Sequence, residues 1–232
     1  DARQTRTAIT TVLETRNQTR TTMKKPSTLR LPIVTAALGI ALLATHSHAT
    51  PRTWNGGGTD SFWTTADNWG GTAPAVNNDS LTFDGTLRRN NTNNYTAITN
   101  VGLVFNTGGW ILNGNPITQA AGTTNTVGTN VINNNIQLTA SRNYTVTADQ
   151  LTINGIISGS TFGITKSGVG MLVLTASNTF SGASTINASG GIVKLTNPRG
   201  MGTGSISIPR TGATTSGYLQ LDIPGVNTIS NT

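Results

Sequence analysis

The chain has 232 residues, a formal charge of +7, no cysteine and only 10% charged side chains. The lack of cysteine excludes a disulfide framework, thiolate catalysis and a cysteine-ligated metal. Most of the positive charge lies in residues 1–30, which hold seven Lys or Arg against two acidic residues, whereas the rest of the chain holds eight against six. Because binding to a nucleic-acid backbone needs clustered cations, this distribution predicts that nucleic acid is not a partner.

Residues 23–49 have the order of a secretory signal peptide. A short cationic segment precedes the apolar residues 33–44, and Ser47 and Ala49 are the small side chains that signal peptidase recognises. The apolar run is too short to span a bilayer core of about 30 Å. We therefore predict a signal-peptide helix that is cleaved after Ala49, with residues 1–22 as a non-native upstream or disordered segment. An uncleaved anchor and a transit peptide are the alternatives.

After residue 49 the chain consists of short apolar alternations separated by Gly and Asn, without helical periodicity of useful length. Alternation of period 2 predicts strands with one face inward and one outward. Apolar positions recur every 20 or 21 residues, at Ile111, Val131, Leu151, Met171 and Ile192. Such a period predicts an all-β fold in which each repeat is one coil of a β-solenoid and each coil is stabilised by its neighbours. An antiparallel β-sandwich, which also has short strands and regular turns, is the alternative.

Asparagine is the most informative polar residue of this part of the chain. From residue 50 on there are 24 Asn against 6 Asp. Asn tolerates left-handed turn conformations, and stacked Asn amides can hydrogen-bond from one coil to the next. We therefore expect asparagine ladders between coils.

The segment 163–195 combines spaced glycines, alternating leucines and an Asn-Thr-aromatic triplet. The positions that carry this pattern are Lys166, Gly168, Gly170, Leu172, Leu174, Asn178, Thr179, Phe180, Gly182, Thr185, Ile186, Gly190 and Ile192. The pattern resembles the autotransporter-associated β-strand repeat, also called the passenger-associated transport repeat. Ala176 stands where this family often has Gly, and the turn at residues 189–191 is one residue longer than usual. The aromatic stretch 54–69 resembles the N-terminal segment of such proteins.

This resemblance implies a right-handed parallel β-helix that is exported to the cell surface, the outer membrane or the extracellular space. It implies an N-terminal capping segment at residues 50–100 and solenoid repeats at 101–232. Family members often end in an outer-membrane barrel or a sorting tail. Neither feature is visible here, so we expect the chain to be truncated at its C-terminus.

The function implied is that of a structural or adhesive passenger protein without catalysis, cofactor or metal. Glycans, matrix or other surface chains are the expected partners. Contact with the membrane is expected only through the export signal and the missing C-terminal module. A secreted β-helix enzyme that acts on polysaccharides, or a carbohydrate-binding module, is the alternative function.

The densest aromatic group offers a candidate binding site. Trp54, Phe62, Trp63 and Trp69 could form a platform for sugar rings, with Asp60, Asp67 and Asn68 as hydrogen-bonding partners. The same rings could instead be a hydrophobic plug over the first coil, because solenoids need capped ends. Exposed, coplanar rings would favour the platform, and buried rings would favour the plug.

Two further groups of side chains could carry chemistry. Asp79 and Asp84, like Asp60 and Asp67, form close pairs of the kind that glycoside cleavage uses, but aspartates in such contexts more often form turns. Lys166 could contact polyanions, although a single lysine on a polar face is usually solvated.

Overall fold

A computed structural model describes residues 50–74, 79–99, 102–209 and 217–225. All of these residues belong to one compact unit, Thr45–Thr232. The predicted upstream segment 1–22, the signal peptide 23–49 and its cleavage-site residues Ser47 and Ala49 lie outside the described residues. In the part that is described, no helix has the length and apolar character needed to cross a membrane.

The described part is all-β, and its one helical element is the short 3-10 helix η1 (Ala66–Trp69). The strands in chain order are β1 (Pro51–Trp54), β2 (Ser80–Phe83), β3 (Asn90–Asn93), β4 (Gly102–Phe105), β5 (Ile111–Gly114), β6 (Ile117–Gln119), β7 (Thr123–Asn125), β8 (Asn130–Ile132), β9 (Ile136–Leu138), β10 (Arg142–Val146), β11 (Gln150–Ile153), β12 (Ile157–Ser158), β13 (Ile164–Ser167), β14 (Met171–Leu174), β15 (Ser184–Ile186), β16 (Ile192–Leu195), β17 (Ile206–Ser207) and β18 (Tyr218–Leu221).

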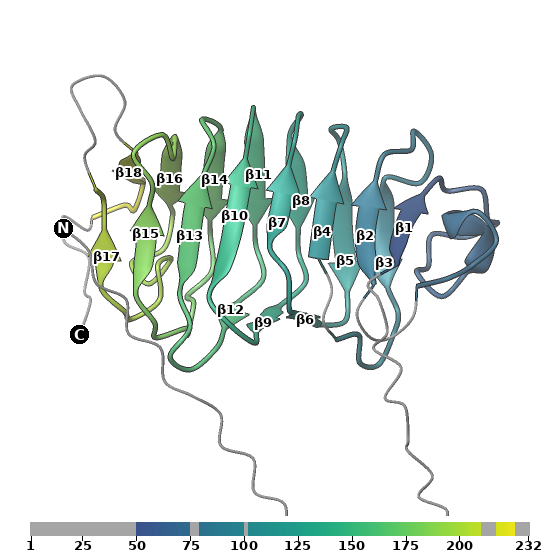
Figure 1. The fold of residues 1–232 in the computed structure, drawn as a ribbon, viewed down its shortest axis with the longest axis horizontal. Coiled ribbons are helices and arrows are strands. Elements are labelled where there is room, and N and C mark those ends of the chain that lie inside the picture. Colours follow the sequence, from purple (N-terminus) through teal and green to yellow (C-terminus); the bar gives the residue numbers. More distant parts are fainter. Residues whose placement is uncertain (1–49, 75–78, 100–101, 210–216, 226–232) are drawn as a thin grey trace, which may run out of the picture. The chain divides into compact units, whose positions relative to one another are not determined.

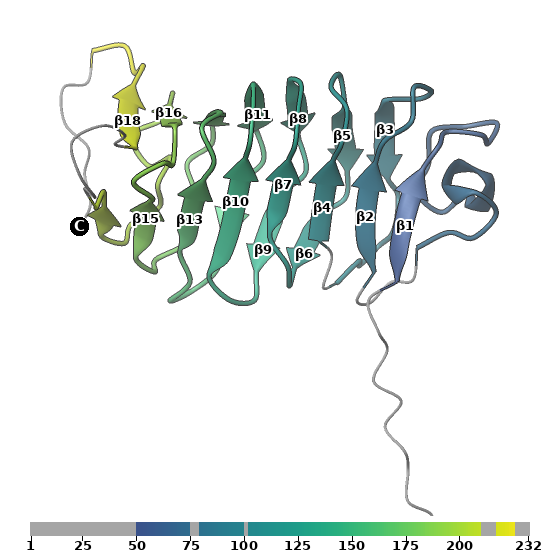
Figure 2. The same cartoon turned by 45° about the horizontal axis from the view of Figure 1, so that its top comes forward.

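These strands form three sheets that run along the stack of coils (Figure 1). The first sheet has eight strands in the order β1-β2-β4-β7-β10-β13-β15-β17, the second has seven in the order β18-β16-β14-β11-β8-β5-β3, and the third has three in the order β12-β9-β6. Successive coils therefore contribute one strand each to neighbouring positions of a sheet, and Figure 2 shows the same stacking from a second direction.

Every pairing between the described strands is parallel. An antiparallel sandwich is therefore excluded, and the predicted parallel β-helix is confirmed. The winding is right-handed, as crossovers between parallel strands almost always are (Figure 1).

The coil length of about 20 residues is also confirmed. Ile111 pairs with Val131, and Met171 pairs with Ile192, as the apolar spacing predicts. The spacing between paired residues varies, however, from 19 for Ile117 and Ile136 to 29 for Pro51 and Ser80. Turns of different length between the strands account for this variation.

One predicted alignment in the apolar series is wrong. Leu151 pairs with Asn130 and Leu172, not with Val131 and Met171. Leu151 and Leu172 face the core, whereas Val131 and Met171 are partly exposed. The apolar repeat in the sequence thus mixes residues of the inner and outer faces, because a shift of one residue moves a strand side chain to the opposite face.

The segment 50–100, expected as an N-terminal cap, also contributes strands to the stack. β1 pairs with β2, β2 pairs with β4, and β3 pairs with β5. The regular parallel pairing therefore begins within this segment. The aromatic residues of the same segment close the N-terminal end of the stack.

Close contact between coils explains several of the glycines. A Cβ atom on Gly163 would lie 1.8 Å from the carbonyl oxygen of Ala183, and one on Gly155 would lie 1.9 Å from that of Asn134. No larger residue fits at these two positions unless the backbone of the neighbouring coil moves. Glycine is therefore abundant for two reasons: the turns require it, and so does the close stacking of the coils.

Candidate functional site: the aromatic cap, the repeat motif and the asparagine ladder

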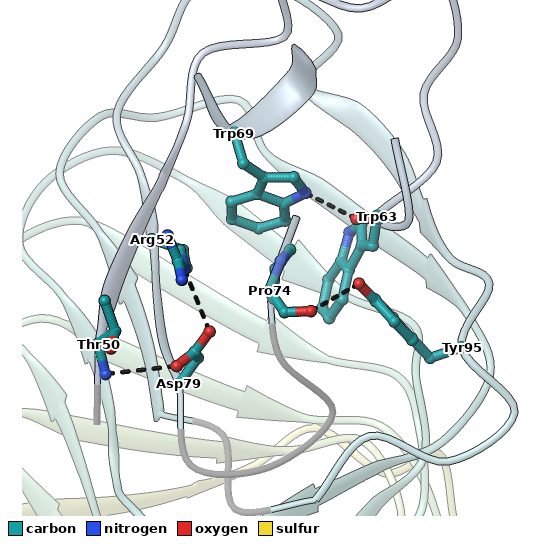
Figure 3. Close-up of polar contacts among 7 residues, drawn as sticks. All are labelled: Thr50, Arg52, Trp63, Trp69, Pro74, Asp79 and Tyr95. Atoms are coloured by element: carbon teal, nitrogen blue, oxygen red, sulfur yellow. Dashed lines mark hydrogen bonds and ion pairs between the residues drawn. The ribbon is translucent and has the colours of Figure 1, made fainter. Parts of the chain in front are cut away.

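The tryptophans singled out as a candidate sugar platform are buried at the N-terminal end of the stack, and Figure 3 shows two of them, Trp63 and Trp69. The ring of Trp69 stands at 87° to that of Trp54 and at 89° to that of Trp63, with centroids 5.0 and 6.1 Å away. Phe83 packs against all three rings from the coil below. Buried, perpendicular rings cannot present a flat stacking surface, so this arrangement is that of a hydrophobic plug.

The polar atoms of the plug are satisfied within the protein. The Trp69 indole donates to the carbonyl oxygen of Trp63 at 2.8 Å, and the Trp63 indole donates to the buried Asn91 Oδ1 at 2.7 Å. The Trp54 indole donates to the carbonyl oxygen of Leu87 at 3.3 Å. Each ring is therefore fixed by a hydrogen bond as well as by packing.

The aspartates near the plug hold turns and strand ends in place. Asp60 accepts hydrogen bonds from the Phe62 amide at 3.0 Å and the Thr65 hydroxyl at 2.9 Å, and the Phe62 bond in particular lowers the pKa of this carboxyl. Asp79 is buried and forms an ion pair with Arg52 at 3.2 Å, which joins the start of β2 to β1 (Figure 3).

Asp67 is exposed in the first turn of η1, and Asp84 is exposed beyond the end of β2. The plug side of the stack is closed further by Tyr95, whose hydroxyl donates to the carbonyl oxygen of Pro74 at 2.7 Å (Figure 3). Among the described residues, no group of three or more acidic or histidine side chains is arranged to hold a metal ion.

Lys166 is not the solvated surface lysine that the sequence suggested. Its side chain is fully buried, and Nζ donates to the carbonyl oxygens of Ser167, Gly168 and Gly190 at 2.8, 2.7 and 2.6 Å. Gly190 belongs to the next coil, so this ammonium group joins two coils. Its donors match the number of carbonyl acceptors, which is how a buried cation without a carboxylate partner can be accommodated.

The other positions of the repeat motif close the coil. Gly168 has a φ of +77°, and a Cβ there would lie 2.3 Å from the carbonyl oxygen of Val146. Asn178 is buried; its Oδ1 accepts from the Ile157 amide at 2.7 Å, and its Nδ2 donates to the carbonyl oxygen of Gly200 at 2.6 Å. This one side chain therefore connects Ile157 of the preceding coil with the following turn at Gly200.

The remaining motif residues divide between core and contacts with the neighbouring coils. The buried apolar side chains are Leu172, Leu174 and Phe180. The glycines against which neighbouring backbone or side-chain atoms pack are Gly170 and Gly182. The Thr179 amide donates to the carbonyl oxygen of Ile157 at 2.9 Å. The motif thus encodes one closed coil and its contacts with the coils on either side.

An exposed asparagine ladder runs along the outside of the seven-stranded sheet. Asn113 Nδ2 donates to Asn90 Oδ1 at 2.7 Å, Asn133 donates to Asn113 at 2.7 Å, and Asn154 donates to Asn133 at 2.8 Å. The Thr175 hydroxyl extends the ladder by donating to Asn154 Oδ1 at 2.9 Å. The predicted stacking of asparagine amides between coils is confirmed.

Sequence reasoning missed a polar network in the core. The buried Tyr144 hydroxyl donates to Gln119 Oε1 at 2.8 Å, and Gln119 Nε2 donates to the Thr123 hydroxyl at 2.6 Å. Burial raises the pKa of Tyr144. The signal available in the sequence was Tyr144 itself, a polar aromatic at an inward position of a strand, since buried tyrosine hydroxyls usually find a partner.

Comparisons with known proteins agree with this geometry. Residues 164–193 match the family described as passenger-associated-transport-repeat. The chain carries an autotransporter repeat. The matched segment begins at β13 and ends within β16, so it contains Lys166 and the motif residues that close the coil.

A second comparison points to a related protein. Over 97 residues the chain is 38% identical to the protein named adhesin BmaC autotransporter from Brucella suis biovar 1 (strain 1330). The aligned stretch covers 41% of this chain and 3% of that adhesin, so the chain corresponds to a small part of its relative. No solved structure matches the chain.

Three carbonyl oxygens surround Lys166 Nζ, and we call them the carbonyl cage. Because of this cage, truncation of Lys166 should destabilise the fold more than truncation of Lys194, which also lies in a strand. Lys166→Met removes three hydrogen bonds from buried carbonyls and should lower the free energy of unfolding by about 3 kcal/mol. Lys194→Met removes only a surface ion pair with Asp222 and should cost less than about 1 kcal/mol. Urea unfolding of the full chain measures both values. Equal losses in the two variants would contradict the cage.

The same site predicts a pH dependence. Burial lowers the pKa of Lys166 from the reference value of 10.5 to about 8. Between pH 8 and 10.5 the folded chain therefore binds fewer protons than the unfolded chain, and stability contributed by this group rises with pH. The stability difference between the wild type and Lys166→Met should widen from pH 7 to pH 10 in urea unfolding. A difference that narrows over this range contradicts a lowered pKa.

Proposed function

We propose that the chain is part of the passenger region of an exported bacterial surface protein, with a structural and adhesive role. The single observation that carries this proposal is the transport repeat at residues 164–193, which lies within a continuous parallel stack of coils. The similarity to an autotransporter adhesin supports the same role.

The fold suits a protein that leaves the cell before it folds. Each coil pairs with the coil before it through backbone hydrogen bonds, so a chain that emerges gradually can add one coil at a time. The absence of cysteine means that no disulfide has to form on the way. The proposed route begins with the signal peptide at residues 23–49, cleaved after Ala49, and ends at the cell surface, the outer membrane or the extracellular space.

The adhesive role is supported by what the side chains outside the core offer. The outer faces carry Thr, Ser and Asn in repeated rows, which suit contacts with glycans, matrix or other surface chains. One member of each candidate acidic pair has a structural task instead, since Asp79 pairs with Arg52 and Asp60 holds a turn. These contacts favour adhesion over cleavage of polysaccharides.

Protease treatment of intact producing cells tests the proposed location. Trypsin should release peptides from residues 50–232 without lysis, and no peptide from residues 1–49 should be recovered, because the signal peptide has been removed. In-frame deletion of residues 50–232 should lower adhesion of the cells to glycan-coated or matrix-coated surfaces. Release of these peptides only after lysis, or unchanged adhesion of the deletion strain, would overturn the proposal.

A further inference from the structure

The outer face of the seven-stranded sheet carries two parallel columns of side chains. In-register pairing aligns one outward residue of each coil with the next, and the first column consists of Ile111, Val131, Thr152 and Val173, of which Val173 is buried. The second column is the asparagine ladder, with the members Asn113, Asn133, Asn154 and Thr175. We call these two columns the amide strip. Aliphatic carbon atoms and amide groups therefore lie side by side over several coils.

The amide strip is uncharged. The outward residues of β3, β5, β8, β11 and β14 are Asn90, Thr92, Ile111, Asn113, Val131, Gln150, Thr152, Met171 and Val173. The first charge within the strands of this sheet is Lys194 of β16, which forms an ion pair with Asp222 at 2.6 Å, whereas Arg89 and Asp149 lie outside the strands, directly before β3 and β11. A polyanion or a charged protein surface would find no counter-charge along the strip, so the face suits a neutral partner.

The ladder fixes the amides before any partner arrives. Asn133 and Asn154 are exposed, and each uses one N–H to reach the Oδ1 of the preceding coil. The second N–H of these two side chains has no acceptor in the ladder and can donate outward. Because their rotamers are already set, binding costs little side-chain entropy. Successive amides follow one another at the spacing of adjacent strands, about 4.8 Å.

An exposed aromatic ring stands at the N-terminal end of the strip. Phe62 forms a parallel bridge with Thr92, which in turn pairs with Asn113 of the ladder. Its side chain is 45% exposed, unlike the tryptophans of the plug. An aromatic face next to fixed amides is the combination that contacts both the C–H face and the hydroxyl groups of a sugar ring.

We infer that the amide strip binds a neutral, linear polysaccharide lying along the stack. The hydroxyl groups of the glycan exchange hydrogen bonds with the amides of Asn133 and Asn154, and its C–H faces contact Ile111, Val131 and the ring of Phe62. This inference rests on the proposed adhesive function and names the class of partner for it. Repetition along the strip makes a chain of sugars, rather than a single sugar, the matching ligand.

The test compares two substitutions within one coil. Val131 and Thr124 are the central residues of the three-residue strands β8 and β7, both are half-buried, and they lie in different sheets. Val131→Lys places a charge on the amide strip, and Thr124→Lys places one on the eight-stranded sheet. Ile111→Lys is a second strip variant at a more exposed position. Circular dichroism and thermal unfolding establish that each full-length variant is folded.

Affinity gel electrophoresis in hydroxyethyl cellulose, laminarin and galactomannan measures binding, with heparin as the anionic comparison. The wild type and Thr124→Lys should be retarded by at least one neutral glycan, and both strip variants should lose about tenfold or more in affinity. No retardation by any neutral glycan, stronger binding to heparin, or equal binding by the strip variants and the wild type would overturn the inference. Cell adhesion that persists in any of these cases would leave the proposed function in place while this inference fails.

Discussion

Parallel backbone pairing between successive coils is the constraint on which the rest of the structure depends. A single coil of about 20 residues cannot bury its apolar face alone, and each sheet exists only because the next coil pairs in register. The column Leu103, Thr123, Tyr144, Lys166 and Ile186 shows how one inward position is carried through five coils. Glycines such as Gly163 are required because the coils approach so closely.

The same stacking creates two demands that the side chains meet. An end of the stack exposes apolar core, and the plug of Trp54, Trp63 and Trp69 covers it at the N-terminal side. The turns leave backbone carbonyls inside the molecule, and Lys166 and Asn178 satisfy them across neighbouring coils. The spacing of the repeat motif is therefore explained by the requirements of coil closure, because its residues satisfy backbone carbonyls and allow close contact between coils.

Much of the fold could be predicted from the sequence, because strand alternation, spaced glycines and a period near 20 follow directly from stacking. The register could not be predicted, since the spacing between paired residues changes from coil to coil and shifts the aligned position, as at Leu151. The buried state of Lys166 was also out of reach, because its three carbonyl acceptors are brought together only by two turns in adjacent coils. The clustering of the tryptophans in the sequence was enough to raise the plug as one of two alternatives. The amide strip, in contrast, could be identified only once the register of the strands was known.

Cross-linking of paired cysteines tests the stacking most directly, because the chain has no cysteine of its own. Thr124 and Thr145 face each other in neighbouring coils, and both side chains point outward. The double variant Thr124→Cys, Thr145→Cys should form an intramolecular disulfide under mild oxidation. Thr124→Cys with Thr147→Cys, shifted by two residues, should not, since its Cα atoms lie more than about 7 Å apart. Equal cross-linking of both pairs, or cross-linking of only the shifted pair, would contradict the in-register stack.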